Sequence, residues 1–278
     1  MKKDPYFSVV IPAYNVSEFI DYTFKSILAQ TYDDYEVIVV NDCSTDNSQE
    51  VINTYALQND KFIKINHSIN KGAGAARNSG LKIVRGEYVL FLDSDDRLVD
   101  SMVLERIKDS TKDKSPDILY MGYIENDKNY LPDPTDSTMS NEITPAVWSK
   151  CWRRKFLEEN VFQFDEGIYY EDMSFSLKGS LLAENIEFLL VPTVNHITRK
   201  GSIMSQANLK KCSDQYRYMA SVMDLYTIVS EEKKHEFLQY ILNEHNEIPY
   251  RISLLLEAIE KGEGVARDYI IGKEEVTL

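Results

Sequence analysis

Phe91-Leu92-Asp93-Ser94-Asp95-Asp96 is the stretch of sequence that decides the fold. The apolar residues 88–92 predict a buried strand, and three carboxylates follow at its end. Side chains two residues apart point to the same side of an extended chain, so Asp93 and Asp95 can face one site. Carboxylates crowded in this way repel each other unless a cation lies among them. Their oxygens suit a hard divalent ion, Mg²⁺ or Mn²⁺, that also binds substrate phosphates.

An acidic turn is the other interpretation of this stretch. Asp96 would then cap a helix that begins near Leu98. Taken alone, the stretch does not separate the two interpretations, so the segments around it have to decide.

Three more apolar segments come before it, each followed by a polar loop and a helical pattern. Strands are expected at residues 7–11, 36–40 and 62–65, and helices at 18–30, 46–55 and 75–84. Pro12 is expected to end the first strand, and Thr45 or Asp46 to cap the second helix.

Strands that alternate with helices predict a parallel, doubly wound α/β sheet, in which ligands bind beyond the carboxyl ends of the strands. Four polar side chains follow the predicted strand ends: Asn15, Asp42, Asn70 and Asp93. We therefore expect them to converge on one edge of the sheet.

The second half of the chain is less regular. One more strand is expected at residues 118–123, and the chain is then polar and rich in Pro and Asp up to residue 144. From Leu209 onward, apolar residues recur every three or four positions, which predicts packed helices.

Composition limits the possible partners. The 278 residues suffice for one large α/β domain with a smaller helical addition, and 43% hydrophobic residues provide a core. The net charge of −14 argues against a nucleic-acid partner and against polybasic attraction to anionic lipid. Cys43, Cys151 and Cys212 lie far apart, as expected of free thiols in a reducing compartment. Without a signal peptide or an apolar membrane span in the sequence, we expect a cytoplasmic protein, with association at the inner face of the membrane left open.

Five pieces of the chain, in this order, resemble family 2 glycosyltransferases of the GT-A type. They are residues 8–15 (SVVIPAYN), 41–46 (NDCSTD), 70–80 (NKGAGAARNSG), 93–96 (DSDD) and 171–175 (EDMSF). The resemblance implies a Rossmann-like GT-A domain over residues 1–205, with a mostly parallel sheet and flanking helices. Residues 1–123 would bind the nucleotide-sugar, and residues 124–205 would supply the acceptor side and a lid. A helical region, 206–278, lies outside the resemblance.

The resemblance also implies a nucleotide pocket. Pro12, Tyr14 and Asn15 are similar to its first wall, for which an ordinary strand-to-helix turn is the alternative. Asp42 resembles the acid that accepts a hydrogen bond from the uracil imide, with helix capping as the alternative.

Further pocket residues follow from the next two pieces. Asn70 and Arg77 resemble base-reading residues, although a solvated arginine is the commoner case. Asp93 and Asp95, with Ser94 between them, resemble the metal-and-ribose motif of the family. Asp95 is the expected direct ligand of Mn²⁺ or Mg²⁺.

Asp172 resembles the general base that takes the proton from the acceptor hydroxyl, and Glu171 is its neighbour in the family's acidic pair. Two acids that open a helix are the structural alternative. Residues 196–205 resemble a mobile loop over the donor phosphates, in which Arg199 would contact the diphosphate and Ser202 or Ser205 would donate a hydrogen bond.

Two interpretations of basic residues stay open. His196 is read as a metal ligand, a stacking residue or a structural histidine. Lys150, Arg153 and Arg154 are read as a patch for an anionic acceptor or as a solvated face.

The resemblance implies an inverting, metal-dependent glycosyltransferase that uses a UDP-sugar. Its acceptor would be a surface glycan, a lipid-linked oligosaccharide or a teichoic-type polymer. A phosphotransferase with an Asp-x-Asp nucleophile carries that pair after its first strand, whereas here it follows the fourth. A non-catalytic nucleotide-sugar-binding subunit is the remaining alternative, and it would be favoured by a missing base. The sugar, the linkage and the oligomeric state are left open.

Overall fold

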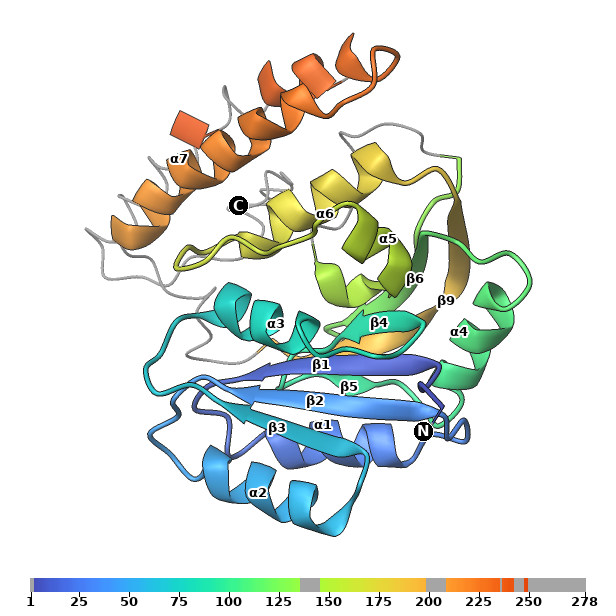
Figure 1. Ribbon diagram of the computed structural model, residues 1–278, viewed down its shortest axis with the longest axis vertical. Helices are drawn as coiled ribbons and strands as arrows, with labels where there is room; N and C mark the ends of the chain where they lie inside the picture. Colours follow the sequence, from blue (N-terminus) through green and yellow to red (C-terminus); the bar gives the residue numbers. More distant parts are fainter. Residues whose placement is uncertain (1–2, 136–145, 199–208, 236, 243–247, 250–278) are drawn as a thin grey trace.

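The computed structural model describes residues 3–135, 146–198, 209–235, 237–242 and 248–249. Within these ranges the strands form one nine-stranded sheet in the order β3-β2-β1-β4-β8-β6-β9-β5, with β7 paired to β6 (Figure 1). The strands are β1 (Phe7–Ala13), β2 (Tyr35–Asn41), β3 (Phe62–Asn66), β4 (Tyr88–Phe91), β5 (Arg97–Leu98), β6 (Ile118–Glu125), β7 (Lys128–Tyr130), β8 (Lys150–Arg153) and β9 (Ile186–His196). The helices are α1 (Ile20–Leu28), α2 (Ser48–Gln58), α3 (Ala73–Leu81), α4 (Val103–Thr111), α5 (Arg154–Glu159), α6 (Glu171–Leu182) and α7 (Leu209–Asp224), with short 3-10 turns η1 (Val147–Ser149) and η3 (Leu225–Thr227).

The predicted fold class, an α/β sheet with flanking helices, is confirmed. Strands β3, β2, β1 and β4 are parallel, as the alternation of strands and helices predicts. Beyond them the sheet is mixed: β8 runs antiparallel to both β4 and β6, whereas β6 and β9 are parallel. Strand β8 therefore lies between two strands that both precede it in the sequence.

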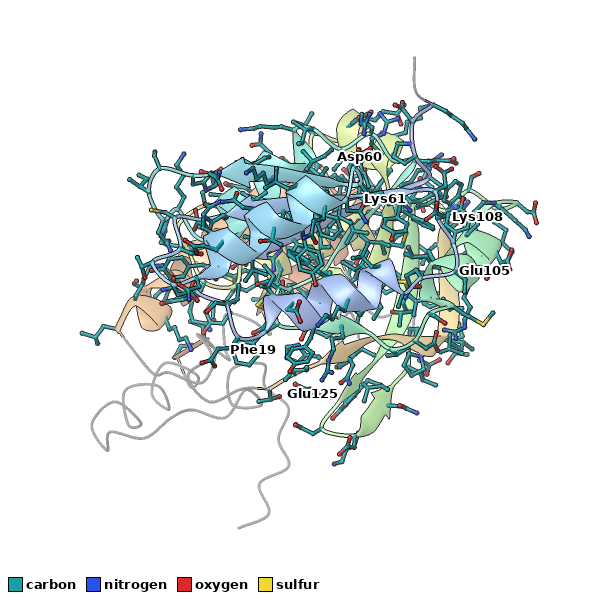
Figure 2. The ribbon with its side chains drawn as sticks, turned by 90° about the horizontal axis from the view of Figure 1, so that it is seen from below. Phe19, Asp60, Lys61, Glu105, Lys108 and Glu125 are labelled. Atoms are coloured by element: carbon teal, nitrogen blue, oxygen red, sulfur yellow. The ribbon has the colours of Figure 1, made fainter. Side chains whose placement is uncertain are left out.

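Alternate residues of the buried strands pack against helices on opposite faces of the sheet. One face of β1 presents Phe7, Val9 and Ile11 to a core that includes apolar residues of α1, α2 and α4. On the other face, Val10 packs with side chains of α5 and α6. Figure 2 looks onto α1 and α2, with Asp60 and Lys61 at the turn that leads into β3. Burial on both faces explains the near-continuous apolar runs in these strands.

Two predicted boundaries were wrong. Strand β1 continues through Pro12, which pairs in register with Val40 of β2. The backbone nitrogen of Pro12 points toward the β4 side of β1. Strand β4 has already ended there, at Phe91, so the N–H that proline lacks is not needed for a hydrogen bond between the two strands. After the acidic stretch, the chain forms the short strand β5 instead of a helix near Leu98, and α4 begins only at Val103.

Helix α7 packs against α6, as Figure 1 shows. Leu177 and Leu181 of α6 meet the buried Tyr218 and Val222 of α7. The predicted helical pattern from Leu209 is therefore confirmed where the structure describes it. In the described part of the chain, none of the helices is both long and apolar enough to span a bilayer.

Candidate active site

The acidic stretch ends β4, and its last carboxylate is a buried anchor. Asp96 accepts hydrogen bonds from His196 Nδ1 (3.0 Å) and from the backbone N–H of Ile197 (2.9 Å). Burial raises the pKa of Asp96 to about 6, against the lowering effect of His196. The interpretation of Asp96 as a helix cap was thus wrong, because its partners lie at the end of β9. His196 also stacks on Trp148, with ring centroids 5.0 Å apart, which agrees with the stacking interpretation.

Arg77, on α3, joins the two acidic pieces of the chain. Its Nη2 donates to Asp93 Oδ1 (2.7 Å) and its Nη1 to Glu171 Oε1 (2.6 Å). The residue is 4% exposed, so both ion pairs lie away from bulk water. Burial opposes the charge of Arg77, but Asp93, Glu171 and Asp172 outweigh it and raise the pKa of the guanidinium. The end of β4 and the start of α6 are held together by one cation.

Asp172 lies in the first turn of α6, next to this bridge. Desolvation and, next, the negative charge of Glu171 raise the pKa of its carboxyl, against the lowering effect of Arg77, to about 7. A carboxylate with such a pKa is matched to proton transfer near neutral pH. Groups with perturbed pKa values beside a polar cluster are typical of active sites.

The donor set at the end of β4 fits a hard divalent ion held by few protein ligands. Asp93 and Asp95 both raise the pKa of Asp96, so negative charge accumulates there. Asp93 uses one oxygen for Arg77, which leaves the other for an ion. Among the residues that the structure describes, no group of three or more His, Cys, Asp and Glu side chains is arranged to hold a metal. An ion held here would take further ligands from substrate phosphates, as Mg²⁺ usually does. Ser94, between the two carboxylates, is buried and accepts a hydrogen bond from Thr23 at its backbone carbonyl.

The loops after β1, β2 and β3 lie at the carboxyl ends of the parallel strands, where the sequence predicts the nucleotide pocket. Asp42 is buried and accepts hydrogen bonds from the backbone N–H groups of Lys71 (3.0 Å) and Gly72 (2.7 Å). Asn70 precedes these two residues and is exposed. The predicted convergence of the polar loops is therefore present for the loops after β2 and β3.

The loop after β1 is tied to the loop after β2. Asn15 has φ of 51°, and its Oδ1 accepts a hydrogen bond from the backbone N–H of Thr45 (2.7 Å). Asp46 joins the same loops, since its Oδ2 accepts from the N–H of Ser17 (3.0 Å) and its Oδ1 from the N–H of Ser48 (3.0 Å). Tyr14 is 40% exposed beside this junction, whereas Pro12 is buried in β1.

Several residues with a predicted role either have other contacts in the structure or lie outside the described residues. The guanidinium of Arg77 lies between two carboxylates, so its base-reading role stays a prediction. Lys150 is fully buried in β8, and Arg153 and Arg154 pair with Asp117 and Glu158 within the chain. The predicted diphosphate contacts, Arg199 and Ser202, lie outside the described residues.

Sequence reasoning missed His67, which follows β3 directly. Its ring contacts Asp42 and, on the other side, Ser79 of α3. The available signal was position: a polar residue just past a strand end lies at the same sheet edge as Asp42.

Comparisons with known proteins agree with this geometry. Residues 8–181 match the model of glycosyl transferase family 2. The chain is 36% identical to the glycosyltransferase GlyG of Streptococcus pneumoniae over 71% of this chain and 72% of GlyG. It is 32% identical to EpsJ, an uncharacterized glycosyltransferase of Bacillus subtilis, over 66% of this chain and 59% of EpsJ.

A solved structure is similar over most of the chain. Residues 1–349 of S. aureus TarS in complex with UDP-GlcNAc superpose with a TM-score of 0.71 at 26% identity, covering 86% of this chain and 72% of that one. TarS has the same mixed α/β architecture with flanking helices. The matches therefore cover both the sheet and the acidic pieces that the Arg77 bridge joins, and the chain belongs to glycosyl transferase family 2.

Proposed function

We propose that the chain transfers a sugar from a UDP-sugar to a hydroxyl group of a surface glycan, a lipid-linked oligosaccharide or a teichoic-type polymer, with inversion at the anomeric carbon. The structures of S. aureus TarS with UDP-GlcNAc and with UDP support the class of donor. TarS is named a poly(ribitol-phosphate) β-N-acetylglucosaminyltransferase, which supports a surface-polymer acceptor. The cytoplasmic location expected from the sequence, with access to the membrane, stays a prediction.

The observation that carries the proposal is the Arg77 bridge. It brings Asp93, which we assign to the donor side, next to the acidic pair of α6, which we assign to the acceptor side. A transferase needs these two functions on either side of one reacting carbon, because a single displacement has both the attacking hydroxyl and the leaving diphosphate in line. Two acidic clusters at separate ends of the sheet could not serve one such step.

Asp172 is proposed as the general base. As the acceptor oxygen attacks the anomeric carbon, Asp172 accepts the hydroxyl proton, and the bond between that carbon and the diphosphate oxygen breaks with its electron pair on the diphosphate. UDP leaves, and the new glycosidic bond has the opposite configuration. The raised pKa of Asp172 makes its carboxylate a stronger base than an ordinary aspartate.

The residues at the end of β4 serve the leaving group. A bound Mn²⁺ or Mg²⁺ would supply positive charge against the diphosphate, and Asp93 and Asp95 would hold it. Ser94 would contribute to the ribose side of this motif. Arg199 is proposed to contact the diphosphate and Ser202 to donate a hydrogen bond to it, as the family resemblance implies.

The uracil side is assigned to the neighbouring loops. Asp42 is proposed to accept the imide N–H of the base, with Asn70 in the adjoining loop. Tyr14 and Asn15 would line the opposite side of the pocket, with Pro12 behind them. These side chains share one sheet edge with Asp93, which is where an α/β sheet binds its ligands.

Release of UDP tests the proposal. The protein is incubated with a panel of UDP-sugars and Mn²⁺, with and without EDTA, and UDP is measured. Slow UDP release that EDTA abolishes is expected, since water can act as a poor acceptor. Release that is absent with every donor, from folded protein that binds UDP, would favour a non-catalytic nucleotide-sugar-binding subunit.

Two substitutions in α6 test the base. Asp172→Asn should lower transfer by about 10²–10⁴, the usual contribution of a positioned base, and leave UDP affinity nearly unchanged. Glu171→Gln is the control at the next residue: its amide oxygen can still accept the hydrogen bond from Arg77, so transfer should fall much less than in Asp172→Asn. If Glu171→Gln is the more damaging change, the base is Glu171.

A further inference from the structure

Three side chains at the nucleotide edge form a continuous hydrogen-bonded line. His67 Nδ1 lies 2.6 Å from Asp42 Oδ1, and His67 Nε2 lies 2.8 Å from Ser79 Oγ. The side chains of His67 and Asp42 are 7% and 3% exposed. The line joins the end of β2, the residue after β3 and the last part of α3, so three elements fix one imidazole.

Hydrogen-bonding chemistry determines the roles in this line. An ionised carboxylate can only accept, so His67 Nδ1 carries the hydrogen that bonds Asp42. In the neutral ring Nε2 is then an acceptor, and the hydroxyl of Ser79 donates to it. A hydroxyl is suited to this position because it can rotate to suit the ring. Both ring nitrogens are thus satisfied, and the ring is held from both sides.

The imidazole completes the set of donors around Asp42. A carboxylate offers about four lone-pair positions. Asp42 receives one hydrogen from His67, one from the N–H of Gly72, and one from the N–H of Lys71, which lies 3.0 Å from both oxygens. These three donors make four contacts with the two oxygens and fix the plane of the carboxylate, so a ligand N–H would take over part of the contact that Lys71 shares between them.

We propose that His67, held by Ser79, is a positioning residue that fixes the Asp42 carboxylate so that the site selects uracil over cytosine. This inference rests on the proposed function, in which Asp42 faces the base. Uracil presents an N–H at ring position 3, which Asp42 can accept in place of part of the shared Lys71 contact. Cytosine presents a lone pair at that position, which repels the carboxylate. A fixed carboxylate cannot turn away from cytosine, whereas one released from His67 can.

Three variants separate positioning from general stability. His67→Phe keeps the bulk of the ring and loses both hydrogen bonds. His67→Asn keeps an N–H donor near the place of Nδ1 and so can still hold Asp42. Ser79→Ala removes only the outer contact of the imidazole. Thermal unfolding shows which variants are folded.

The assay is calorimetric titration of UDP and of CDP in the same Mn²⁺ buffer. The wild-type protein should bind UDP at least about tenfold more tightly than CDP, because the site pairs with one base and repels the other. In His67→Phe the ratio of UDP affinity to CDP affinity should fall to near one. In Ser79→Ala this ratio should fall to an intermediate value, and in His67→Asn most of the preference for UDP should remain. In turnover, His67→Phe should raise the KM for the UDP-sugar and leave kcat almost unchanged.

Each contrary result would overturn a different part of the proposal. A wild-type protein that binds UDP and CDP equally would overturn the uracil assignment of the proposed function, and this inference with it. A wild-type preference that persists unchanged in folded His67→Phe would overturn the role of His67 alone. If His67→Phe does not fold, Ser79→Ala decides: an unchanged UDP-to-CDP ratio in that variant overturns the inference.

Discussion

Replacing Arg77 with methionine should move the pH dependence of transfer and the stability of the protein together. The substitution keeps a long, unbranched side chain and removes the cation between Asp93 and Glu171. Both ion pairs are largely buried, and removing one partner of a buried pair costs about 3–5 kcal/mol of folding free energy. The same cation lowers the pKa of Asp172.

The pH dependence follows from Asp172. Its folded-state pKa of about 7 lies above that of an unfolded aspartate, so its contribution to stability is full below the unfolded pKa and is lost as the pH rises through about 7. A neighbouring arginine lowers a carboxyl pKa by about 1–3 units. Without it, Asp172 loses its proton only at higher pH. The destabilisation should therefore grow above pH 7, by about 1.4 kcal/mol for each unit of the change in pKa.

Urea unfolding at pH 6 and pH 9 measures the free energy of unfolding, and the profile of kcat/KM against pH measures the pKa of the proposed base. In Arg77→Met the acidic limb of the profile of kcat/KM against pH should move to higher pH, by about 1–3 pH units. Arg77→Lys is the matched control: it keeps the charge without the planar fork, so it should lose stability and keep the limb. An unmoved limb in folded Arg77→Met would refute the electrostatic argument.

Three other predictions concern separate parts of the site and its support. Asp95→Asn should weaken Mn²⁺-dependent UDP binding and turnover together, and calorimetry with Mn²⁺ and with EDTA checks both; equal loss in EDTA would contradict a metal role. Phe175→Ala should cost about 3–5 kcal/mol, since this buried ring stacks on Phe164 at 4.0 Å, as measured by chemical unfolding. Gly74→Ala should destabilise the protein and slow transfer, because a Cβ would lie 2.2 Å from the Asp165 carbonyl and press on the start of α6; an unchanged melting temperature would argue against this contact.

The parallel half of the sheet was predictable because its information is local. Each strand from β1 to β4 is an apolar run that ends in a polar loop, and the helices between them carry their own period. The antiparallel half was not predictable in this way. Strand β8 is four residues long and begins with the buried Lys150, so its pattern is not that of an isolated strand. Its place depends on pairing with β4 and β6, which are distant in sequence.

The residues of the candidate site also divide into those that the local sequence indicates and those that depend on distant contacts. Residue types at strand ends indicated Asp93 and Asp42 from the sequence, since parallel strands bring their carboxyl ends to one edge. Contacts across long separations did not follow from any local signal. Asp96 meets His196 100 residues later, and Arg77 meets Glu171 94 residues later. A helix cap was the local interpretation of Asp96, and the base-reading role that the resemblance implies for Arg77 stays a prediction.

The position of β8 has a consequence for the order in which the chain can assemble during synthesis. Strands β1 to β4 are neighbours in the sheet and, apart from the outer edge of β4, pair only with one another, so they can form a sheet as soon as they leave the ribosome. Strands β5 and β6 emerge next but cannot join that sheet, since β5 pairs with β9 and β6 is separated from β4 by β8, both of which are made later. Nascent chains that end after residue 125 should therefore expose the apolar residues of β6 to a chaperone or protease, and chains that extend through α5 should protect them.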